Sequence, residues 1–398
     1  MTGCRIALRL SCRGGAMKPG LALLLLSFIL THGCGGSSNN NGGNNGGGTN
    51  STAPPTITTQ NAQNGAVIVS LSPVTQGSII HYTLDGSTPT ASSQLYQAPF
   101  LVASNLTVNA IAILGGTAST VTTQAFSPNI PSGTLVWSDE FTNNTGTNAQ
   151  PNASIWTYDL GTNCCGNNEL EDYCAWNSSI APCDPANPNA YLGATDNYLH
   201  IIGRNPSGTI YTSARLKSQG LFSFMYGRIE ASMKLPEAQG MWPAFWMLGN
   251  NIATISWPAC GELDIMEHID GNNPPPYQGA PPPGYDWIAG SVHGGTSASE
   301  INGSQTYHPL GFSAADWHTY GMIWKPGSIQ YYVDDPANIY ATFTPTNSNF
   351  NSTTWPFDQG PQFIILNLAI GGDWPGSPDG TTSFPQAMLV DYVRIYTN

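Results

Sequence analysis

Short runs of alternating apolar and polar residues dominate the chain from about residue 53 to its end. Turn-forming residues separate these runs at short intervals, as in β-strands joined by tight connections. No stretch carries the 3.6-residue periodicity of a convincing helix, so the chain is predicted to be all-β. The pattern predicts strands at Ala66–Leu71, Leu106–Ile111, Leu221–Tyr226, Gly227–Lys234, Ile329–Val333, Phe363–Ala369 and Met388–Tyr396.

Changes in composition divide the sequence into four segments. Residues 1–34 read as an export signal, because four basic residues precede the apolar run Leu21–Leu30. Residues 35–52 are nearly pure Gly, Ser and Asn and predict a flexible linker. Residues 53–129 predict a small Ig-like β-sandwich. Residues 130–398 predict a two-sheet jelly-roll sandwich whose concave face would suit an extended polymer.

Cys34 stands at the end of the predicted export signal, directly after the small residue Gly33. This junction resembles a bacterial lipoprotein signal, with Thr31 where such signals usually carry an apolar residue. A lipid anchor on Cys34 is therefore one outcome, and simple cleavage with secretion is the other. In both cases we expect an exported protein, either held in the cell envelope or released.

Charged residues are scarce and mostly acidic. Seven Lys and Arg follow residue 34 against 24 Asp and Glu, so the mature chain has a formal charge of −17. Such a surface repels polyanions, which argues against nucleic acid and heavily sulfated polysaccharides as partners. The many Asn, Ser, Thr, Gly and aromatic residues favour neutral, hydroxyl-rich ligands instead.

Five cysteines follow Cys34, and four of them cluster within twenty residues. In an exported protein such clustering favours local disulfides over metal ligation. The number is odd, so at least one thiol stays unpaired within the chain, and the spacing leaves the connectivity open. The five are Cys164, Cys165, Cys174, Cys183 and Cys260.

The segment from Gly261 to Glu267 concentrates three acidic residues. In a strand Glu262 and Asp264 share one face, while Leu263 and Ile265 point into the core. Plain alternation would bury Glu267 among apolar side chains, at a cost of several kcal/mol. A β-bulge that absorbs one residue near Met266 would return Glu267 to the polar face.

Three acids in one row would suit retaining glycoside hydrolysis, which needs two carboxyl groups roughly 5–5.5 Å apart. Glu262 and Glu267 would have to lean toward one another, with Asp264 between them. Asp264 would then hydrogen-bond the nucleophile and help keep the acid/base protonated through like-charge coupling.

At this point the resemblance to a known family is plain. The chain from Leu135 onward resembles glycoside hydrolase family 16, in its laminarinase branch, whose fold is a concanavalin-like jelly roll. The family's bulged motif Glu-x-Asp-x-x-Glu matches Glu262, Asp264 and Glu267, which implies nucleophile, assisting acid and acid/base in that order. Other matching segments are Trp137–Phe141, Gly166–Leu170, Tyr226–Ala231, Trp242–Leu248 and Asn367–Gly376.

The resemblance also implies residues that bind substrate. Sugar rings present apolar faces that stack on indoles, so Trp242, Trp246 and Trp374 are candidate subsite residues. His293 and Asn168 match residues that family members place beside the substrate. Trp137, Trp317 and Trp324 are assigned to the core, and His268 is assigned a structural role.

A structural calcium ion is the one cofactor that the resemblance implies, and none is expected for catalysis. Glu140 and Asp391 lie near the two ends of the last domain, and hard oxygen ligands suit Ca²⁺. Without a metal the two are ordinary surface carboxylates.

The N-terminal sandwich has its own resemblance. The segment Ile80–Thr90, followed by Tyr96 and Pro99, resembles the chitobiase C-terminal-like Ig-fold module. The match implies a fold but not a function, so a spacer role and weak sugar binding both stay open.

The sequence thus predicts a monomeric endo-β-1,3-glucanase whose partner is a β-glucan, with mixed β-1,3/1,4-glucan as a second substrate. Two alternatives stay open. One keeps the fold and mechanism on a galactan such as agar. The other is a non-catalytic glucan-binding protein, although such proteins typically lack the catalytic glutamates.

Overall fold

The computed structural model describes residues 51–162, 166–269, 286–296, 298–346, 350–351 and 353–398. The predicted export signal, Cys34, almost all of the linker, Cys164 and Cys165 lie outside the described residues. Thr52–Asn398 form one compact unit. No helix in the described part of the chain has the length and hydropathy needed to cross a membrane.

Residues 56–126 form two small antiparallel sheets, as the alternating pattern there predicts. One sheet has the order β1-β2-β5, and the other has the order β4-β3-β6-β7 with β8 also paired to β6. Their strands are β1 (Thr56–Asn61), β2 (Val67–Ser72), β3 (Ile79–Thr83), β4 (Gln94–Leu95), β5 (Phe100–Val102), β6 (Leu106–Leu114), β7 (Thr117–Ala118) and β8 (Thr122–Phe126). Val69, Tyr82, Phe100 and Val108 are among the side chains of their core.

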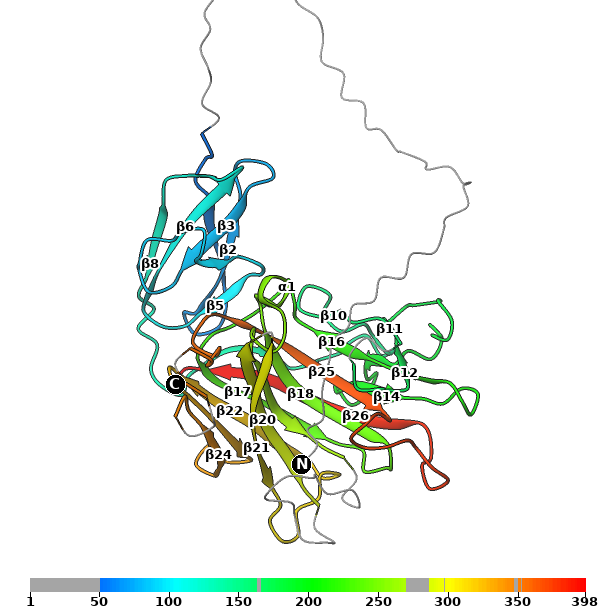
Figure 1. Ribbon diagram of the computed structural model, residues 1–398. Helices are drawn as coiled ribbons and strands as arrows, with labels where there is room; N and C mark the ends of the chain where they lie inside the picture. Colours follow the sequence, from blue (N-terminus) through cyan, green and yellow to red (C-terminus); the bar gives the residue numbers. More distant parts are fainter. Residues whose placement is uncertain (1–50, 163–165, 270–285, 297, 347–349, 352) are drawn as a thin grey trace, which may run out of the picture. The chain divides into compact units, whose positions relative to one another are not determined.

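From residue 135 onward the chain builds two large sheets (Figure 1). The seven-stranded sheet has, in spatial order, β10 (Thr157–Tyr158), β16 (Arg215–Lys217), β25 (Gln362–Ile370), β18 (Met241–Gly249), β19 (Glu262–Glu267), β20 (Ile288–Thr296) and β21 (Ser299–Tyr307). The eight-stranded sheet has β13 (Ala190–Leu192), β14 (Leu199–Gly203), β26 (Gln386–Tyr396), β17 (Gly227–Lys234), β22 (His318–Lys325), β23 (Ser328–Val333) and β24 (Ile339–Phe343), with β9 (Leu135–Asp139) paired to β26.

Two smaller features complete the fold. A three-stranded sheet has the order β11 (Gly161–Thr162), β12 (Glu171–Tyr173) and β15 (Tyr211–Ser213). The four-residue helix α1 (Ile252–Ile255) lies between β18 and β19. The all-β fold with a jelly-roll sandwich is confirmed.

One shared core contains apolar side chains from both large sheets. Phe245, Leu263 and Leu366 from the seven-stranded sheet belong to the same cluster as Met322 and Tyr331 from the eight-stranded sheet. Alternation along each strand therefore turns the intervening side chains of the seven-stranded sheet to its other face, which we call the outer face.

Most predicted strands are confirmed, but the segment Leu221–Tyr226 is not a strand. The N–H groups of Leu221 and Phe222 donate to Ser218 O, which makes a turn. Phe222 and Phe224 are buried as predicted, yet Tyr226 has φ of 60°, a left-handed conformation that ends the extended backbone. Apolar content alone suggested a strand where the chain turns.

Trp137 and Trp324 are buried, as expected, but the core assignment of Trp317 is wrong. Its side chain is 38% exposed. It lies just before β22, and its ring packs at 4.7 Å from the ring of Tyr198 on the surface. His268 is structural as expected, because it is buried and its Nδ1 lies 2.7 Å from Trp287 O.

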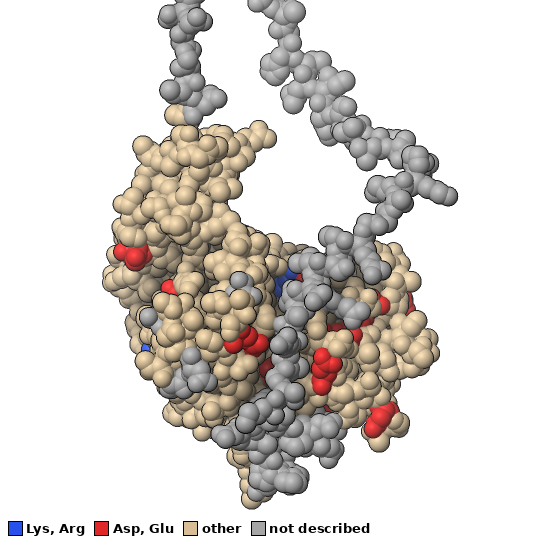
Figure 2. All heavy atoms as spheres, in the orientation of Figure 1, with Lys and Arg blue, Asp and Glu red and all other residues tan. Residues whose placement is uncertain are grey.

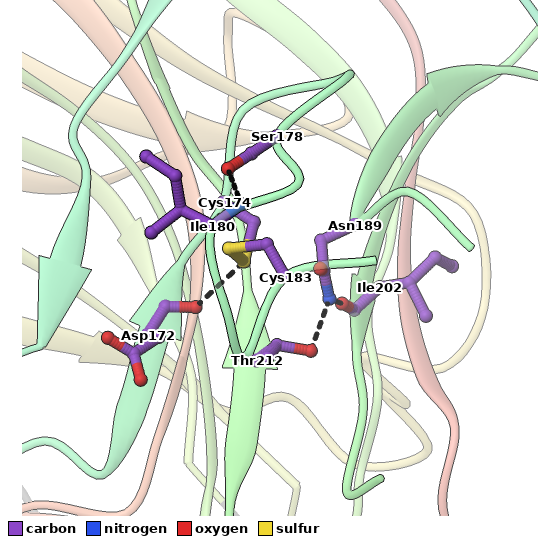
Figure 3. Close-up of a disulfide and its surroundings, with 8 residues drawn as sticks. All are labelled: Asp172, Cys174, Ser178, Ile180, Cys183, Asn189, Ile202 and Thr212. Atoms are coloured by element: carbon purple, nitrogen blue, oxygen red, sulfur yellow. Dashed lines mark hydrogen bonds between the residues drawn. A yellow bond between two sulfur atoms is a disulfide. The ribbon is translucent and has the colours of Figure 1, made fainter. Parts of the chain in front are cut away.

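A local disulfide joins Cys174 to Cys183, as the clustering predicts, while Cys260 is a buried free thiol. Cys174 directly follows β12, so the bridge holds the next loop against that strand (Figure 3). Beyond the loop, the buried amide of Asn189 donates to Ile202 O at 2.7 Å and to Thr212 Oγ1 at 3.0 Å. The disulfide therefore closes the loop from Cys174 to Cys183, and buried hydrogen bonds of Asn189 fix the chain that follows it.

We expect the double variant Cys174→Ser/Cys183→Ser to unfold more easily. Closing a loop of about ten residues removes entropy from the unfolded chain, which corresponds to about 2–3 kcal/mol of stability. Chemical denaturation, followed by tryptophan fluorescence, measures this loss. A double variant as stable as the wild type would show that the bridge contributes nothing to stability.

Candidate active site

The strand β19 carries the three acids that the sequence singled out. Between Asp264 and Glu267, β19 advances three residues while its neighbour β18 advances two, and the pairing with β20 shifts over the same stretch. Ile265 and Met266 are both buried in the core. The predicted β-bulge is confirmed, and it places Glu267 on the outer face with Glu262 and Asp264.

Each of the two glutamates accepts a hydrogen bond from an indole. Trp257 Nε1 donates to Glu262 Oε2 at 2.9 Å, and Trp242 Nε1 donates to Glu267 Oε1 at 3.0 Å. Trp242 comes from β18, and Trp257 comes from the connection between α1 and β19. The two carboxyl groups are thus oriented by separate elements.

Asp264 lies between the glutamates and beside a histidine. His293 on β20 is the cross-strand partner of Glu262. His293 Nε2 lies 3.1 Å from Asp264 Oδ2. One carboxylate oxygen of Glu262, one of Asp264 and one ring nitrogen of His293 all lie within 4.8 Å of one another. Since Asp264 is only 3% exposed, its carboxylate has little contact with solvent.

The surroundings of the two glutamates raise the pKa of both carboxyl groups. Burial, followed by the negative charge of Asp264, raises the pKa of Glu262 to about 8. The same two causes raise the pKa of Glu267 well above its usual value. In both glutamates burial and the charge of Asp264 favour the protonated form, which an acid catalyst needs, while the hydrogen bond from an indole N–H favours the charged form that a nucleophile needs.

Trp246 lies on the outer face opposite Asp264, but it is not a freely exposed platform. Its Nε1 donates to Asn367 Oδ1 at 2.7 Å, and the guanidinium of Arg215 lies 4.5 Å from its ring centre. Asn367 donates in turn to Tyr173 Oη at 3.2 Å. One face of the indole is thus covered by Arg215, so a sugar would stack on the other face.

Trp374 and Asn168 come together at the other end of the acidic row. The ring of Trp374 meets that of Trp242 edge to face at 5.3 Å. Asn168, which is exposed, donates to Asp373 Oδ1 at 2.9 Å. Gly372 allows this contact between loops, since a Cβ there would lie 3.0 Å from Asn167 O and its φ is 113°. Trp374 therefore contacts the indole that donates to Glu267, and Asn168 is bonded to Asp373, the residue that precedes Trp374.

Sequence reasoning missed three residues of this site: Trp257, Arg215 and Glu300. Glu300 Oε1 lies 2.7 Å from His293 Nδ1. Arg215 pairs with Asp159, with Nε 2.9 Å from Oδ2. Only Trp257 had a sequence signal, because it lies beside Pro258 in a turn five residues before Glu262.

The predicted calcium ligands have other contacts. Glu140 accepts two hydrogen bonds from Arg394, at 2.9 and 2.7 Å. Partial burial raises the pKa of Asp391, which disfavours its charged form. A carboxylate held by a guanidinium is a poor ligand for Ca²⁺, so these two residues as arranged do not fit the ion. Calcium stays a prediction, and no step below uses it.

We expect Trp257→Phe to move the acidic limb of the pH–activity profile to higher pH. The change keeps an aromatic ring but removes the N–H that stabilises the charged form of Glu262. Because a hydrogen bond to a charged group is worth about 1.5–3 kcal/mol, the acidic limb of the kcat/KM profile should move up by about one to two pH units. Trp246→Phe is the matched control, since its N–H donates to an amide. Equal limbs in both variants would contradict this role of Trp257.

Comparison with known proteins gives matches over both folded segments. The family model described as glycosyl hydrolases family 16 matches residues 186–394. The model described as chitobiase/beta-hexosaminidase C-terminal domain matches residues 54–124. The second match agrees with the resemblance noted for the N-terminal sandwich.

Individual relatives match about two thirds of this chain. The chain is 36% identical over 271 residues to a "Beta-glucanase" of Rhodothermus marinus, covering 66% of this chain and 84% of that one. It is 32% identical over 286 residues to a "Glucan endo-1,3-beta-glucosidase" of Cryptopygus antarcticus, covering 66% and 92%. The solved laminarinase of Rhodothermus marinus superimposes with a TM-score of 0.53 at 36% identity, covering 67% of this chain and 98% of that one.

Proposed function

Because this chain belongs to glycosyl hydrolases family 16, we propose that it is an endo-acting glycoside hydrolase that cleaves β-1,3-glucan with retention of configuration. The observation that carries the proposal is the row Glu262, Asp264 and Glu267 on one face of β19, with each glutamate held by an indole N–H. The similarity to a β-glucanase and to a solved laminarinase supports the choice of polymer.

The first step forms a glycosyl-enzyme. Glu267, kept protonated by burial and by the charge of Asp264, gives its proton to the glycosidic oxygen. The ionised Glu262 attacks the anomeric carbon from the opposite side as the bond to that oxygen breaks. The proton leaves with the released end of the glucan, and Glu267 becomes a carboxylate.

The second step releases the sugar. Glu267, now a carboxylate, takes a proton from a water molecule that attacks the anomeric carbon. The bond to Glu262 breaks, and two inversions give net retention. Trp257 stabilises Glu262 as a leaving carboxylate through the same hydrogen bond that lowers the pKa of that group.

The surface charge agrees with a neutral polymer as substrate. Figure 2 shows acidic side chains scattered over the visible face and few basic ones. Arg215 and Lys217 do lie on β16, but both pair with Asp159. A heavily sulfated chain would therefore find little free positive charge among the described residues near Glu262.

Product analysis on laminarin, mixed-linkage β-glucan and agarose tests the proposal. We expect the mature protein to release oligosaccharides from laminarin, with mixed-linkage glucan as a weaker substrate. Glu262→Ala and Glu267→Ala should both lower the rate of release by on the order of a hundredfold or more. Release from agarose alone would keep the mechanism and overturn the substrate, and no release from any polymer would favour a binding protein.

We also propose that the protein is exported and attached to the cell envelope through a lipid on Cys34, with the Ig-like module as a spacer. The Cys174–Cys183 disulfide supports export, because such bonds form in oxidising compartments. Mass spectrometry of the mature N-terminus tests the anchor. Acylated Cys34 is the expected result, and an unmodified N-terminus would replace anchoring by secretion.

A further inference from the structure

Resting on the proposed function, we propose that Glu300 is a positioning residue that holds His293 as a charged imidazolium between itself and Asp264. His293 would then act through its charge on the acidic row, in addition to any contact with substrate. Glu300 lies on β21, an edge strand on which the sequence pointed to no functional residue.

Strand register brings Glu300 to His293. On β21, Asn302 lies opposite His293 and Glu300 lies opposite Gly295. Residues two apart share a face, so Glu300 and Asn302 both lie on the outer face of the sheet. Glu300 has no side chain opposite it on β20, because Gly295 is there, and its carboxyl group reaches back to His293.

Four contacts surround the His293 ring and the Glu300 carboxyl group. Glu300 Oε1 lies 2.7 Å from His293 Nδ1, and it also accepts a hydrogen bond from Asn302 Nδ2 at 2.9 Å. On the other side of the ring, His293 Nε2 lies 3.1 Å from Asp264 Oδ2. The ring of Trp257 lies 6.3 Å from the imidazole. His293 is therefore hydrogen-bonded at Nδ1 and lies at ion-pair distance from Asp264 at Nε2, and its side chain is only 18% exposed.

Hydrogen-bond chemistry decides the charge of the ring. Ionised carboxylates only accept hydrogen bonds, and a neutral imidazole has a single N–H. The Nδ1–H of His293 donates to Glu300, and a proton on Nε2 as well gives the ring the positive charge that pairs with Asp264 at 3.1 Å. Burial by itself would lower the pKa of His293, but the contacts with Asp264 and Glu300 raise it well above its usual value.

A positive charge on His293 lowers the pKa of both glutamates. The titratable groups that face His293 are Glu262, Asp264 and Glu267 on β19 and Glu300 on β21. Burial and the charge of Asp264 raise the pKa of Glu262, and the imidazolium opposes that rise. Without the imidazolium, Glu262 would keep its proton to higher pH and fail as a nucleophile there.

The test compares Glu300→Gln with Asp334→Asn. Glutamine keeps the shape of Glu300 and removes its charge. Asp334 is a matched control, because it lies 2.9 Å from His318 Nδ1 outside the site. The measurements are an NMR titration of the His293 ring and the pH profile of kcat/KM on laminarin.

In Glu300→Gln we expect the pKa of His293 to fall by about one unit or more, since removal of one charged neighbour shifts a pKa by about that amount. The acidic limb of kcat/KM should move to higher pH, while KM on the plateau stays unchanged. Asp334→Asn should change neither quantity. Glu300→Asp, which restores the charge, should recover part of the shift.

Two results would overturn the proposal. One is a His293 titration in Glu300→Gln that equals that of the wild type. The other is a loss of activity that is the same at every pH, as a purely structural role would give. The titration needs no substrate, so an inactive wild type would contradict the proposed function without hiding the outcome for Glu300.

Discussion

Replacing Glu262 with alanine is expected to lower kcat/KM on laminarin by on the order of 10⁵-fold, the scale seen when a covalent nucleophile is removed. Trp257 Nε1 donates to Glu262 Oε2 at 2.9 Å, which favours the charged carboxylate that attacks the anomeric carbon. No other carboxylate on β19 can replace it, since Asp264 is buried and lies against His293. Initial rates on laminarin measure the loss.

Azide separates the loss of a nucleophile from a loss of structure. In Glu262→Ala the space left by the carboxylate lies on the face of the sugar opposite the leaving group. Azide entering there, with an activated aryl β-glucoside, should give the α-glycosyl azide. A β-glycosyl azide from this variant would contradict the assignment of Glu262 as nucleophile.

Glu267→Ala is expected to lose on the order of 10²–10⁴-fold on laminarin, because general acid–base catalysis contributes about that factor. The first step should recover with an aryl glycoside whose leaving group needs no proton. The second step should stay slow, because no base remains to activate water. A burst of aryl alcohol followed by a slow steady state is the expected time course.

The two glutamates should also differ in the product formed with azide. In Glu267→Ala the nucleophile Glu262 is intact, so azide attacks the glycosyl-enzyme and gives the β-glycosyl azide. Equal losses on laminarin and on the activated glycoside would contradict the acid/base role. Unchanged thermal unfolding of both variants is the control for folding.

The acidic row could be predicted because a strand leaves few choices. Alternation alone fixed the faces of Glu262 and Asp264 and exposed the conflict at Glu267. Burying a charge next to Leu263 and Ile265 is so unfavourable that a β-bulge was the simplest arrangement to predict. The structure has this bulge at Ile265 and Met266. The faces of these three acids could therefore be predicted from the residues of this strand alone.

The partners of the row could not be predicted in the same way, because they come from distant parts of the chain. Glu300 reaches His293 only through the pairing of β20 with β21, and neither strand is marked by strong alternation of apolar residues. Arg215 reaches Trp246 from β16, across β25. Contacts of this kind depend on sheet order.

The wrong assignments have a common physical cause. Leu221–Tyr226 and Trp317 are apolar or aromatic, and hydrophobic character was taken as evidence for regular or buried structure. Phe222 buries its ring from the end of a turn and Phe224 from an isolated β-bridge with Gln362, while Trp317 packs on Tyr198 at the surface. Burial and strand geometry are separate properties, and the apolar character of a residue is not enough to predict either of them.

The configuration of the first product shows whether Glu262 and Glu267 cleave the glucan by double displacement. Proton NMR, recorded during hydrolysis of laminarin by the wild-type protein, distinguishes the two anomers before they interconvert. A retaining mechanism predicts that new reducing ends appear first as the β anomer and then equilibrate with the α anomer. Reducing ends that appear first as the α anomer, or none at all, would contradict a double displacement by Glu262 and Glu267.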